Sequence, residues 1–201
     1  MNSGFSALFN RSTACIAVGW FLSFPVVADS SGFAARAVAA GDTRGQAFAV
    51  IDKVTATLSI YAPTGKLLAA SPVLVGLAKG DENVPGIGNR PIASIEPHER
   101  TTPAGRFKSE PGQTLTGQSV VWIDYDAAVS IHPMRPSNPS EKRLSRLATA
   151  TPTDNRITYG CVNVPVDFYE RWVMPNLGQK PGLVYVLPEM QPAKKIFSFL
   201  R

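Results

Sequence analysis

Once the expected N-terminal signal sequence, with Cys15, is removed, one thiol and two imidazoles remain for nucleophilic chemistry: Cys161, His98 and His132. A thiol with a pKa of about 8.5 is only slightly ionised at neutral pH, and a nearby imidazole raises that fraction. The same imidazole can protonate a leaving amine, so the two groups together suit acyl transfer. His132 closes a run of strand-forming residues, a rigid position, whereas His98 lies in the loop sequence EPHERTTP. The pattern therefore favours His132 as the base.

Gly160 directly precedes the cysteine and permits a backbone turn that a larger residue would resist. Such a turn can aim consecutive N–H groups at one point, where an oxyanion would be held. The same Gly-Cys pair is also compatible with a tight packing position around a buried, inert thiol. The residues by themselves leave both interpretations open.

Metal binding and a basic surface are the other two possibilities. Cys161, His132 and His98 lack the local spacing of a metal site, so we expect no metal and no cofactor. Residues 134–156 are polar and hold five basic side chains around Glu141 and Asp154, namely Arg135, Lys142, Arg143, Arg146 and Arg156. This segment is either a solvated helix face or a lid that presents guanidinium groups to substrate carboxylates.

The elements that would position these residues are mostly strands. Apolar and β-branched runs predict strands, and 165–175 predicts a short helix on which Phe168, Trp172 and Val173 share a face. A second helical piece is expected over 140–148, with Ser140 as its cap and Leu144 and Leu147 facing inward. The predicted strand-forming segments are 47–62, 66–76, 119–133, 157–165 and 182–189, with a loop region over 77–106.

The composition agrees with a β-rich protein of one domain. Seventeen prolines and sixteen glycines among 201 residues, with 17% charged residues, exclude a coiled coil or a helical bundle. The net charge of +5 reflects a mild basic excess spread along the chain, which does not favour nucleic acid as a partner.

The N-terminus predicts export. Residues 1–28 place Arg11 before an apolar run of about 14 residues, shorter than the roughly 20 that span a bilayer, and end in Val-Val-Ala. We expect a signal peptide cleaved near Ala28, although a membrane anchor or a buried helix are alternatives. Cys15 leaves with it and is not a convincing lipid attachment site. Residues 29–45 are expected to be a flexible lead-in, 46–189 the folded domain and 190–201 a tail of unknown order.

Several motifs in order resemble the L,D-transpeptidase catalytic domain (YkuD type). VIDKVTATLSIY resembles the opening strand pair of that family and PVLVG the strand that follows. TTPAGRF resembles its T-P-x-G-x-F turn, SIHP its upstream histidine, and TYGCVNVP its S/T-H-G-C-x-N/R motif. The resemblance spans about residues 46–189.

The resemblance implies a mainly β fold, an L,D-transpeptidase-like β-sandwich with a mixed sheet and one or two short helices. It also implies Cys161 as acylated nucleophile, His132 as base and the Pro133 carbonyl as the group that orients the imidazole. Thr158, Gly160 and Asn163 match motif positions, and amides near Gly160 and Cys161 are expected to hold the oxyanion. Asn163, Arg135 and Arg156 are expected to bind substrate.

Two features depart from the family pattern. Tyr159 stands where the family has a histidine, and the span from His132 to Cys161 is longer than usual by roughly a dozen residues. A phenol with a pKa near 10 is a poor base at neutral pH but can donate a hydrogen bond and stack, so Tyr159 is expected to orient substrate.

The implied function is peptidoglycan transpeptidation in the periplasm, in which stem peptides are the partner and no stable membrane anchor remains after signal cleavage. Water as acceptor would instead make the same acyl-enzyme an L,D-carboxypeptidase or hydrolase of wall-linked peptides. A non-catalytic wall-binding module with a buried thiol is the third possibility. The sequence does not define the oligomeric state.

Overall fold

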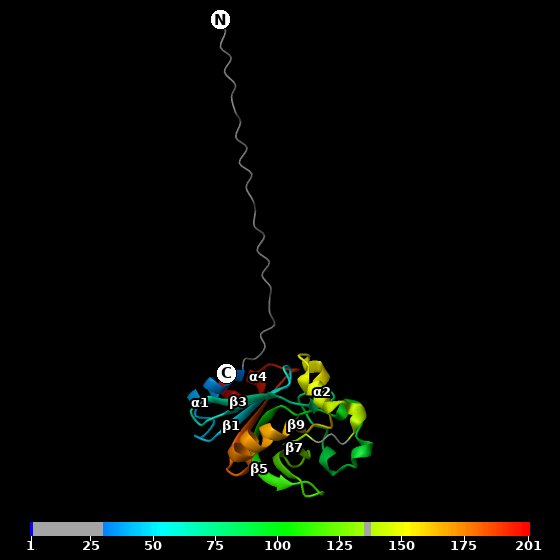
Figure 1. Cartoon of the computed structure of the whole chain (residues 1–201). Helices are drawn as coiled ribbons and strands as arrows, with labels where there is room; N and C mark the ends of the chain where they lie inside the picture. The colour runs from blue at the N-terminus through cyan, green and yellow to red at the C-terminus, as the bar shows by residue number, and fades with distance from the viewer. Residues whose placement is uncertain (2–29, 135–137) are drawn as a thin grey trace.

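The computed structural model describes residue 1 and residues 30–134 and 138–201 of the chain (Figure 1). Residues 2–28 of the predicted signal peptide, with Cys15 and Ala28, and the predicted substrate-binding Arg135 lie outside the described residues. The strands are β1 (Phe48–Asp52), β2 (Thr57–Tyr61), β3 (Leu67–Pro72), β4 (Val75–Gly76), β5 (Gly105–Gln113), β6 (Ser119–Asp124), β7 (Val129–Pro133), β8 (Arg156–Thr158), β9 (Val162–Val164) and β10 (Gly182–Leu187). The helices are α1 (Ser30–Ala39), α2 (Arg143–Ala148), α3 (Val166–Phe168), which continues into a π-helix over Tyr169–Gly178, and α4 (Ala193–Ile196).

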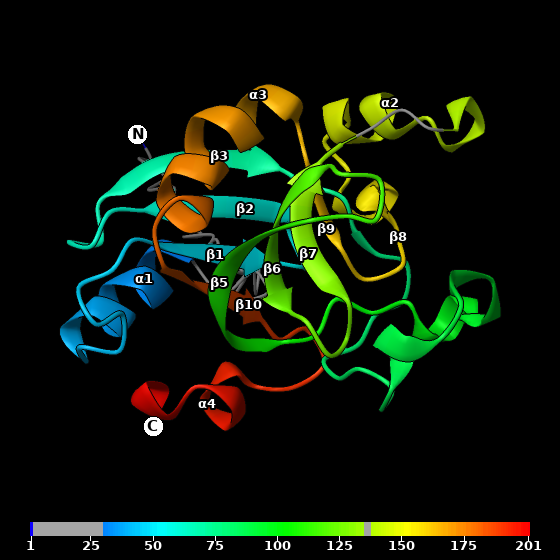
Figure 2. The ribbon, with the colours of Figure 1, turned by 90° about the horizontal axis from the view of Figure 1, so that it is seen from below.

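Eight strands form one mixed sheet in the order β3-β2-β1-β10-β5-β6-β7-β9, and β4 pairs with β8 separately. Strand β5 joins the two halves of the large sheet, because residues 105–109 pair with β10 and residues 110–113 pair with β6. The sheet curves strongly toward a barrel (Figure 2). The expected mainly β fold with a mixed sheet and short helices is confirmed.

Alternation along the strands divides the core in two. On β1, Ala49 and Ile51 face one cluster of buried side chains, whereas Phe48 and Val50 face the other, as the two-residue period of a strand requires. The π-helix lies against the first cluster through Tyr169, which is buried together with Val173 and Leu177. This cluster also includes residues of β7 and β9, so it fixes the strand that carries His132 and the strand that directly follows Cys161.

The second cluster corrects the expectation of a flexible lead-in. Residues 30–39 form helix α1, and its Phe33 packs edge-to-face against Tyr185 and Phe197. The C-terminal tail is ordered in the same way, since α4 is followed by a 3-10 turn over Ser198–Leu200 that lies near α1 (Figure 2). Burial of aromatic side chains fixes α1 and the C-terminal residues in place. In the sequence, Phe33 and Phe197 are the residues that could have indicated this packing.

Four local differences from the predictions concern the segments around the site. Residues 119–133 form two strands joined by a turn, so the run is a hairpin, β6–β7, and β5 was not predicted at all. Ser140 does not cap the helix: it lies in a 3-10 turn over Pro139–Glu141 that is capped by Asn138, whose side chain accepts a hydrogen bond from the Ser140 N–H. Helix α2 begins only at Arg143, after Lys142, which makes no side-chain capping hydrogen bond. Leu147 is buried as expected, but Leu144 is exposed.

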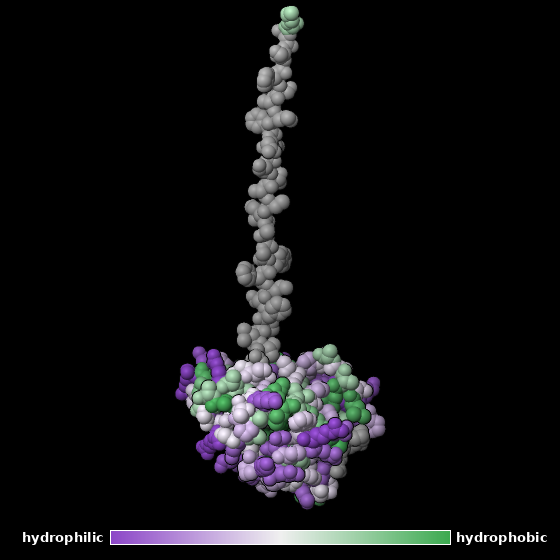
Figure 3. Space-filling view, turned by 60° about the vertical axis from the view of Figure 1, so that its left-hand side comes forward, coloured by the Kyte–Doolittle hydropathy of each residue, from purple (hydrophilic) through white to green (hydrophobic). Residues whose placement is uncertain are grey.

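Polar and apolar side chains are interspersed over the face of the molecule shown in Figure 3. Within residues 30–134 and 138–201, no helix has the length and apolar character needed to cross a membrane.

Candidate active site

Two parallel strands bring the predicted catalytic residues together. β7 and β9 pair with Ile131 opposite Val162 and His132 opposite Asn163. The apolar members of these pairs face the core, so His132 and Asn163 share the opposite face of the sheet. Cys161 precedes β9 on that face, and its Sγ lies 3.7 Å from Ser130 Oγ.

His132 has a hydrogen-bond partner at each ring nitrogen. Nδ1 lies 3.2 Å from the carbonyl oxygen of Pro133, and Nε2 lies 3.1 Å from Nδ2 of Asn163. Since a carbonyl only accepts and an amide NH₂ only donates, Nδ1 carries the proton and Nε2 accepts. The Pro133 carbonyl therefore stands where the resemblance implied it.

The environment of Cys161 lowers the pKa of its thiol. Burial raises the pKa of the Cys161 thiol, but interaction with the His132 imidazole and with Ser130 outweighs burial, so that the pKa lies below its ordinary value. The thiol is half-buried, not sealed in the core, and its sulfur also lies 3.4 Å from the carbonyl oxygen of Ala128.

The turn before the cysteine requires glycine. Gly160 has φ of 129°, and a Cβ there would lie 2.7 Å from the carbonyl oxygen of Thr101. Thr158 closes the turn, because its hydroxyl donates to the Cys161 carbonyl (2.6 Å) and accepts from the Gly160 N–H (3.2 Å). The Gly160 amide that was expected to hold an oxyanion is thus already bonded, which leaves the Cys161 N–H as the amide of that pair for such a role.

A cavity of about 350 Å³ opens beside this turn. Both His132 and Cys161 line it. The full set of described lining residues is Ile92, Thr116, Gln118, His132, Arg143, Thr158, Tyr159, Cys161 and Asn163. Tyr159 is exposed at 41%, and the Arg100 guanidinium carbon lies 3.9 Å from its ring centroid. Such cation–π stacking fixes the phenol at the wall of the cavity, in a position to orient a ligand.

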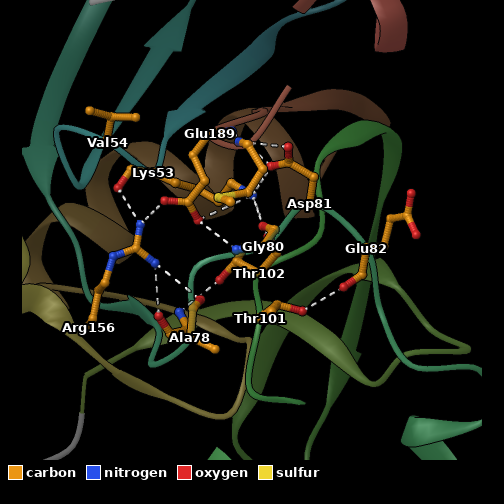
Figure 4. Close-up of polar contacts among 12 residues, drawn as sticks. Lys53, Val54, Ala78, Gly80, Asp81, Glu82, Thr101, Thr102, Arg156 and Glu189 are labelled. Carbon is orange, nitrogen blue, oxygen red and sulfur yellow. Dashed lines mark hydrogen bonds and ion pairs between the residues drawn. The ribbon is translucent and has the colours of Figure 1, made fainter. Parts of the chain in front are cut away.

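Arg156 takes a structural position instead of the predicted substrate-binding one. Its guanidinium forms an ion pair with Glu189 and donates to the carbonyl oxygens of Lys53, Gly76 and Ala78 (Figure 4). It is absent from the described cavity lining. Asn163 does line the cavity, but its side-chain amide is committed to His132 and Arg143.

A buried charge cluster around Lys53 holds Thr102, whose hydroxyl bonds to the carbonyl of Gly160. Lys53 is fully buried, and its Nζ donates to Asp81 Oδ1 at 2.8 Å and to the Thr102 carbonyl at 2.9 Å (Figure 4). Burial lowers the pKa of Lys53, which the hydrogen bond and charge of Asp81 only partly oppose. The cluster therefore holds the Thr102 backbone, next to Gly160, in one position.

Sequence reasoning missed the roles of Ser130 and Thr102, and left that of Arg143 undecided between a solvated face and a lid. Ser130 could have been found by its two-residue spacing from His132, whereas no local pattern indicates that Thr102 meets Gly160. The alternative imidazole, His98, is exposed and lies 3.3 Å from Glu96. It is absent from the cavity lining among the described residues.

No family model matches this sequence, and no curated protein matches it. Solved structures do match. Among its structural neighbours are L,D-transpeptidase catalytic domains. The catalytic domain of the E. faecium L,D-transpeptidase is 19% identical, with a TM-score of 0.40 over 71% of this chain and 98% of that chain.

Two longer proteins are also similar. The L,D-transpeptidase from Mycobacterium smegmatis is 18% identical, with a TM-score of 0.39 over 70% of this chain and 58% of that one. The helical cell shape determining protein Pgp2 (K307A mutant) from Campylobacter jejuni is 16% identical, with a TM-score of 0.46 over 73% of this chain and 48% of that one. The chain thus spans about half to three-fifths of the length of these two proteins.

Proposed function

We propose that this protein is an exported cysteine acyltransferase of the L,D-transpeptidase type, acting on peptidoglycan stem peptides in the periplasm. The placement of Cys161 and His132 side by side at a cavity, with the Pro133 carbonyl behind the imidazole, is the observation that carries the proposal. The ordered motifs around both residues support the substrate class, and the sequence of residues 1–28 supports export.

In the first half-reaction, His132 Nε2 takes the proton of Cys161, and the thiolate attacks the carbonyl carbon of the diaminopimelate residue in a tetrapeptide stem. The resulting oxyanion accepts a hydrogen bond from the Cys161 N–H. The carbon–nitrogen bond then breaks, the imidazolium returns its proton to the leaving amine, and D-alanine departs. A thioester remains on Cys161.

In the second half-reaction, a side-chain amine of another stem attacks the thioester. His132 removes a proton from that amine, an amide forms and the Cys161 thiolate leaves. The product is a 3–3 cross-link. The stacked Tyr159 ring and the Thr116 and Gln118 side chains at the cavity wall provide the surface on which donor and acceptor are oriented.

The experiment is incubation of the purified protein with tetrapeptide muropeptides, with D-alanine release measured and products identified by mass spectrometry. We expect release of D-alanine and cross-linked dimers. Tripeptides without dimers would replace the transpeptidase by an L,D-carboxypeptidase, since water would be the acceptor. Absence of D-alanine release would contradict the enzymatic proposal and favour a wall-binding module.

The matched control is Cys161→Ala, with Ser130→Ala as a neighbouring substitution. Cys161→Ala should abolish release, while Ser130→Ala, which removes a hydroxyl 3.7 Å from the sulfur, should only slow it. Release that persists unchanged in Cys161→Ala would reject the assignment of the nucleophile.

A further inference from the structure

Arg143 reaches the candidate active site from the helix of the 134–156 segment. Residues four apart share a helix face, so burial of Leu147 among Leu74 and Met134 turns Arg143 toward the sheet as well. The Arg143 side chain is 16% exposed, and its Nε donates to Glu141 Oε2 at 2.5 Å. Its Nη1 donates to Oδ1 of Asn163 on β9.

This contact decides which end of the Asn163 amide faces the imidazole. A guanidinium has donors and no acceptor, so the amide must present its oxygen to Arg143. The NH₂ group is thereby turned toward His132, where Nδ2 lies 3.1 Å from Nε2. Turning the amide over would set its NH₂ group against the guanidinium, donor against donor. Arg143 and His132 are thus linked through one side chain that has two unequal ends.

The orientation of the amide matters for proton transfer. Asn163 donates to Nε2 and the Pro133 carbonyl accepts from Nδ1, and these two hydrogen bonds together fit the tautomer that carries its proton on Nδ1. A proton arriving at Nε2 from Cys161 would face the amide NH₂ group, again donor against donor. The amide therefore opposes the imidazolium that the thiolate requires, and it limits how far His132 favours ionisation of Cys161.

The other polar groups around Cys161 and His132 do not fix the orientation of the Asn163 amide. Ser130, a residue of β7, lies beside Cys161. Gln118 Nε2 lies 3.4 Å from the Pro133 carbonyl oxygen. The charged groups are Arg143 with its partner Glu141 on one side and Arg100, stacked on Tyr159, at the cavity wall. Of the residues named here, only Arg143 bonds to the Asn163 oxygen.

We propose that Arg143 is a positioning residue that sets the proton equilibrium between Cys161 and His132 by fixing the orientation of the Asn163 amide. The inference rests on the proposed function, in which His132 accepts the Cys161 proton. It gives α2 a regulatory role at the nucleophile: Arg143 holds the resting thiol back from ionisation, and its guanidinium also lines the candidate substrate cavity.

The test is the pH dependence of Cys161 alkylation by iodoacetamide, a small neutral probe, in the full chain. Arg143→Met and Asn163→Ala should each move the midpoint of the rate profile to lower pH by about half to one unit, the size expected for one hydrogen bond. The double variant should behave like Asn163→Ala alone, because Arg143 acts through the amide. Arg146→Met removes the same charge from the same helix but bonds to backbone carbonyls of Glu141 and Asp154, so it should leave the midpoint unchanged.

An unchanged midpoint in Arg143→Met would overturn the proposal. A shift of equal size in the Asn163→Ala background would also overturn it, because Arg143 would then act by charge alone. A second measurement needs no variant: nitrogen-15 NMR of the imidazole should find the proton of neutral His132 on Nδ1, and a proton on Nε2 would refute the amide orientation.

Alkylation does not require turnover, so its outcome is separable from the proposed function. A protein that releases no D-alanine yet shows the predicted shifts would refute the transpeptidase and keep the role of Arg143. The converse result, normal turnover with no shifts, would refute only the role of Arg143.

Discussion

The hydroxyl of Thr102 donates a 2.8 Å hydrogen bond to the carbonyl of Gly160, the residue before the cysteine. Thr102 is 1% exposed, and its oxygen also accepts from the Gly76 N–H at 2.9 Å. One buried hydroxyl therefore ties together the turn that aims Cys161, strand β4 and the loop that ends in the predicted TTPAGRF turn.

Replacement of this hydroxyl should loosen the nucleophile turn. Thr102→Val leaves a buried donor and a buried acceptor unpaired, so we expect a loss of about 1–3 kcal/mol in the free energy of unfolding. D-alanine release should fall with it. Thr102→Ser keeps the hydroxyl and should retain most of both, as measured by urea denaturation and by release assays. A valine variant as stable as the serine variant would show that the bond to Gly160 does not matter.

Gly160 should resist even the smallest side chain. In Gly160→Ala the new Cβ meets the Thr101 carbonyl, and the positive φ strains any L residue, which costs on the order of 1–3 kcal/mol. Gly86→Ala is the matched control, since Gly86 also has positive φ (74°) but no atom within 4 Å of its Cβ position. We expect the Gly160 variant to lose more thermal stability than the control and to lose release activity, which the control retains. Equal losses in the two variants would show that the close approach of the Thr101 carbonyl to Gly160 does not matter.

Much of the fold was predictable from local sequence, because strands with one buried face carry a visible alternation. Residues 47–62 and 182–189 contain β1, β2 and β10 as expected. Strand β5 was missed because RFKSEPGQ lacks β-branched residues, and its pairing on both sides comes from tertiary context. Helix α1 was missed because small residues hide the one aromatic side chain, Phe33, that anchors it.

For the candidate site, the sequence predicted the residues that meet along adjacent strands. It did not predict the position of a side chain that is held by backbone groups far away in the sequence. His132, Cys161 and Asn163 come together through the β7–β9 register. The position of Arg156 depends on Glu189 and on three backbone carbonyls, none of which is near it in sequence. In the sequence, a charged residue in a polar segment has the same pattern around it whether it faces substrate or completes a buried ion pair.

Arg156 should contribute to stability and not to substrate affinity. The Arg156 and Glu189 side chains are 10% and 4% exposed, and removal of one partner from such a pair costs about 3–5 kcal/mol when the pair is fully buried. We expect Arg156→Met to show a large loss in urea denaturation with KM unchanged in the remaining folded protein. Arg90→Met, which breaks the more exposed pair with Glu99, should lose less stability. A raised KM with normal stability would restore a substrate-binding role to Arg156.

The two histidines should differ sharply. Since burial raises the pKa of the Cys161 thiol and His132 lowers it, His132→Ala should move the midpoint of the alkylation profile to higher pH and remove most D-alanine release. His98 is exposed beside Glu96, so His98→Ala should change neither. The measurements are iodoacetamide kinetics from pH 5 to pH 10 and the release assay, and equal losses in the two variants would reverse the assignment of the base.

The acyl-enzyme itself provides the most direct test of the central claim. Intact-protein mass spectrometry after rapid acid quenching of a reaction with tetrapeptide muropeptide should find one added tripeptide-containing acyl group, and fragmentation should place it on Cys161. The adduct should be absent from Cys161→Ala and should accumulate more slowly in His132→Ala. D-alanine release by the wild-type protein with no adduct on Cys161, or with an adduct on another residue, would contradict the account.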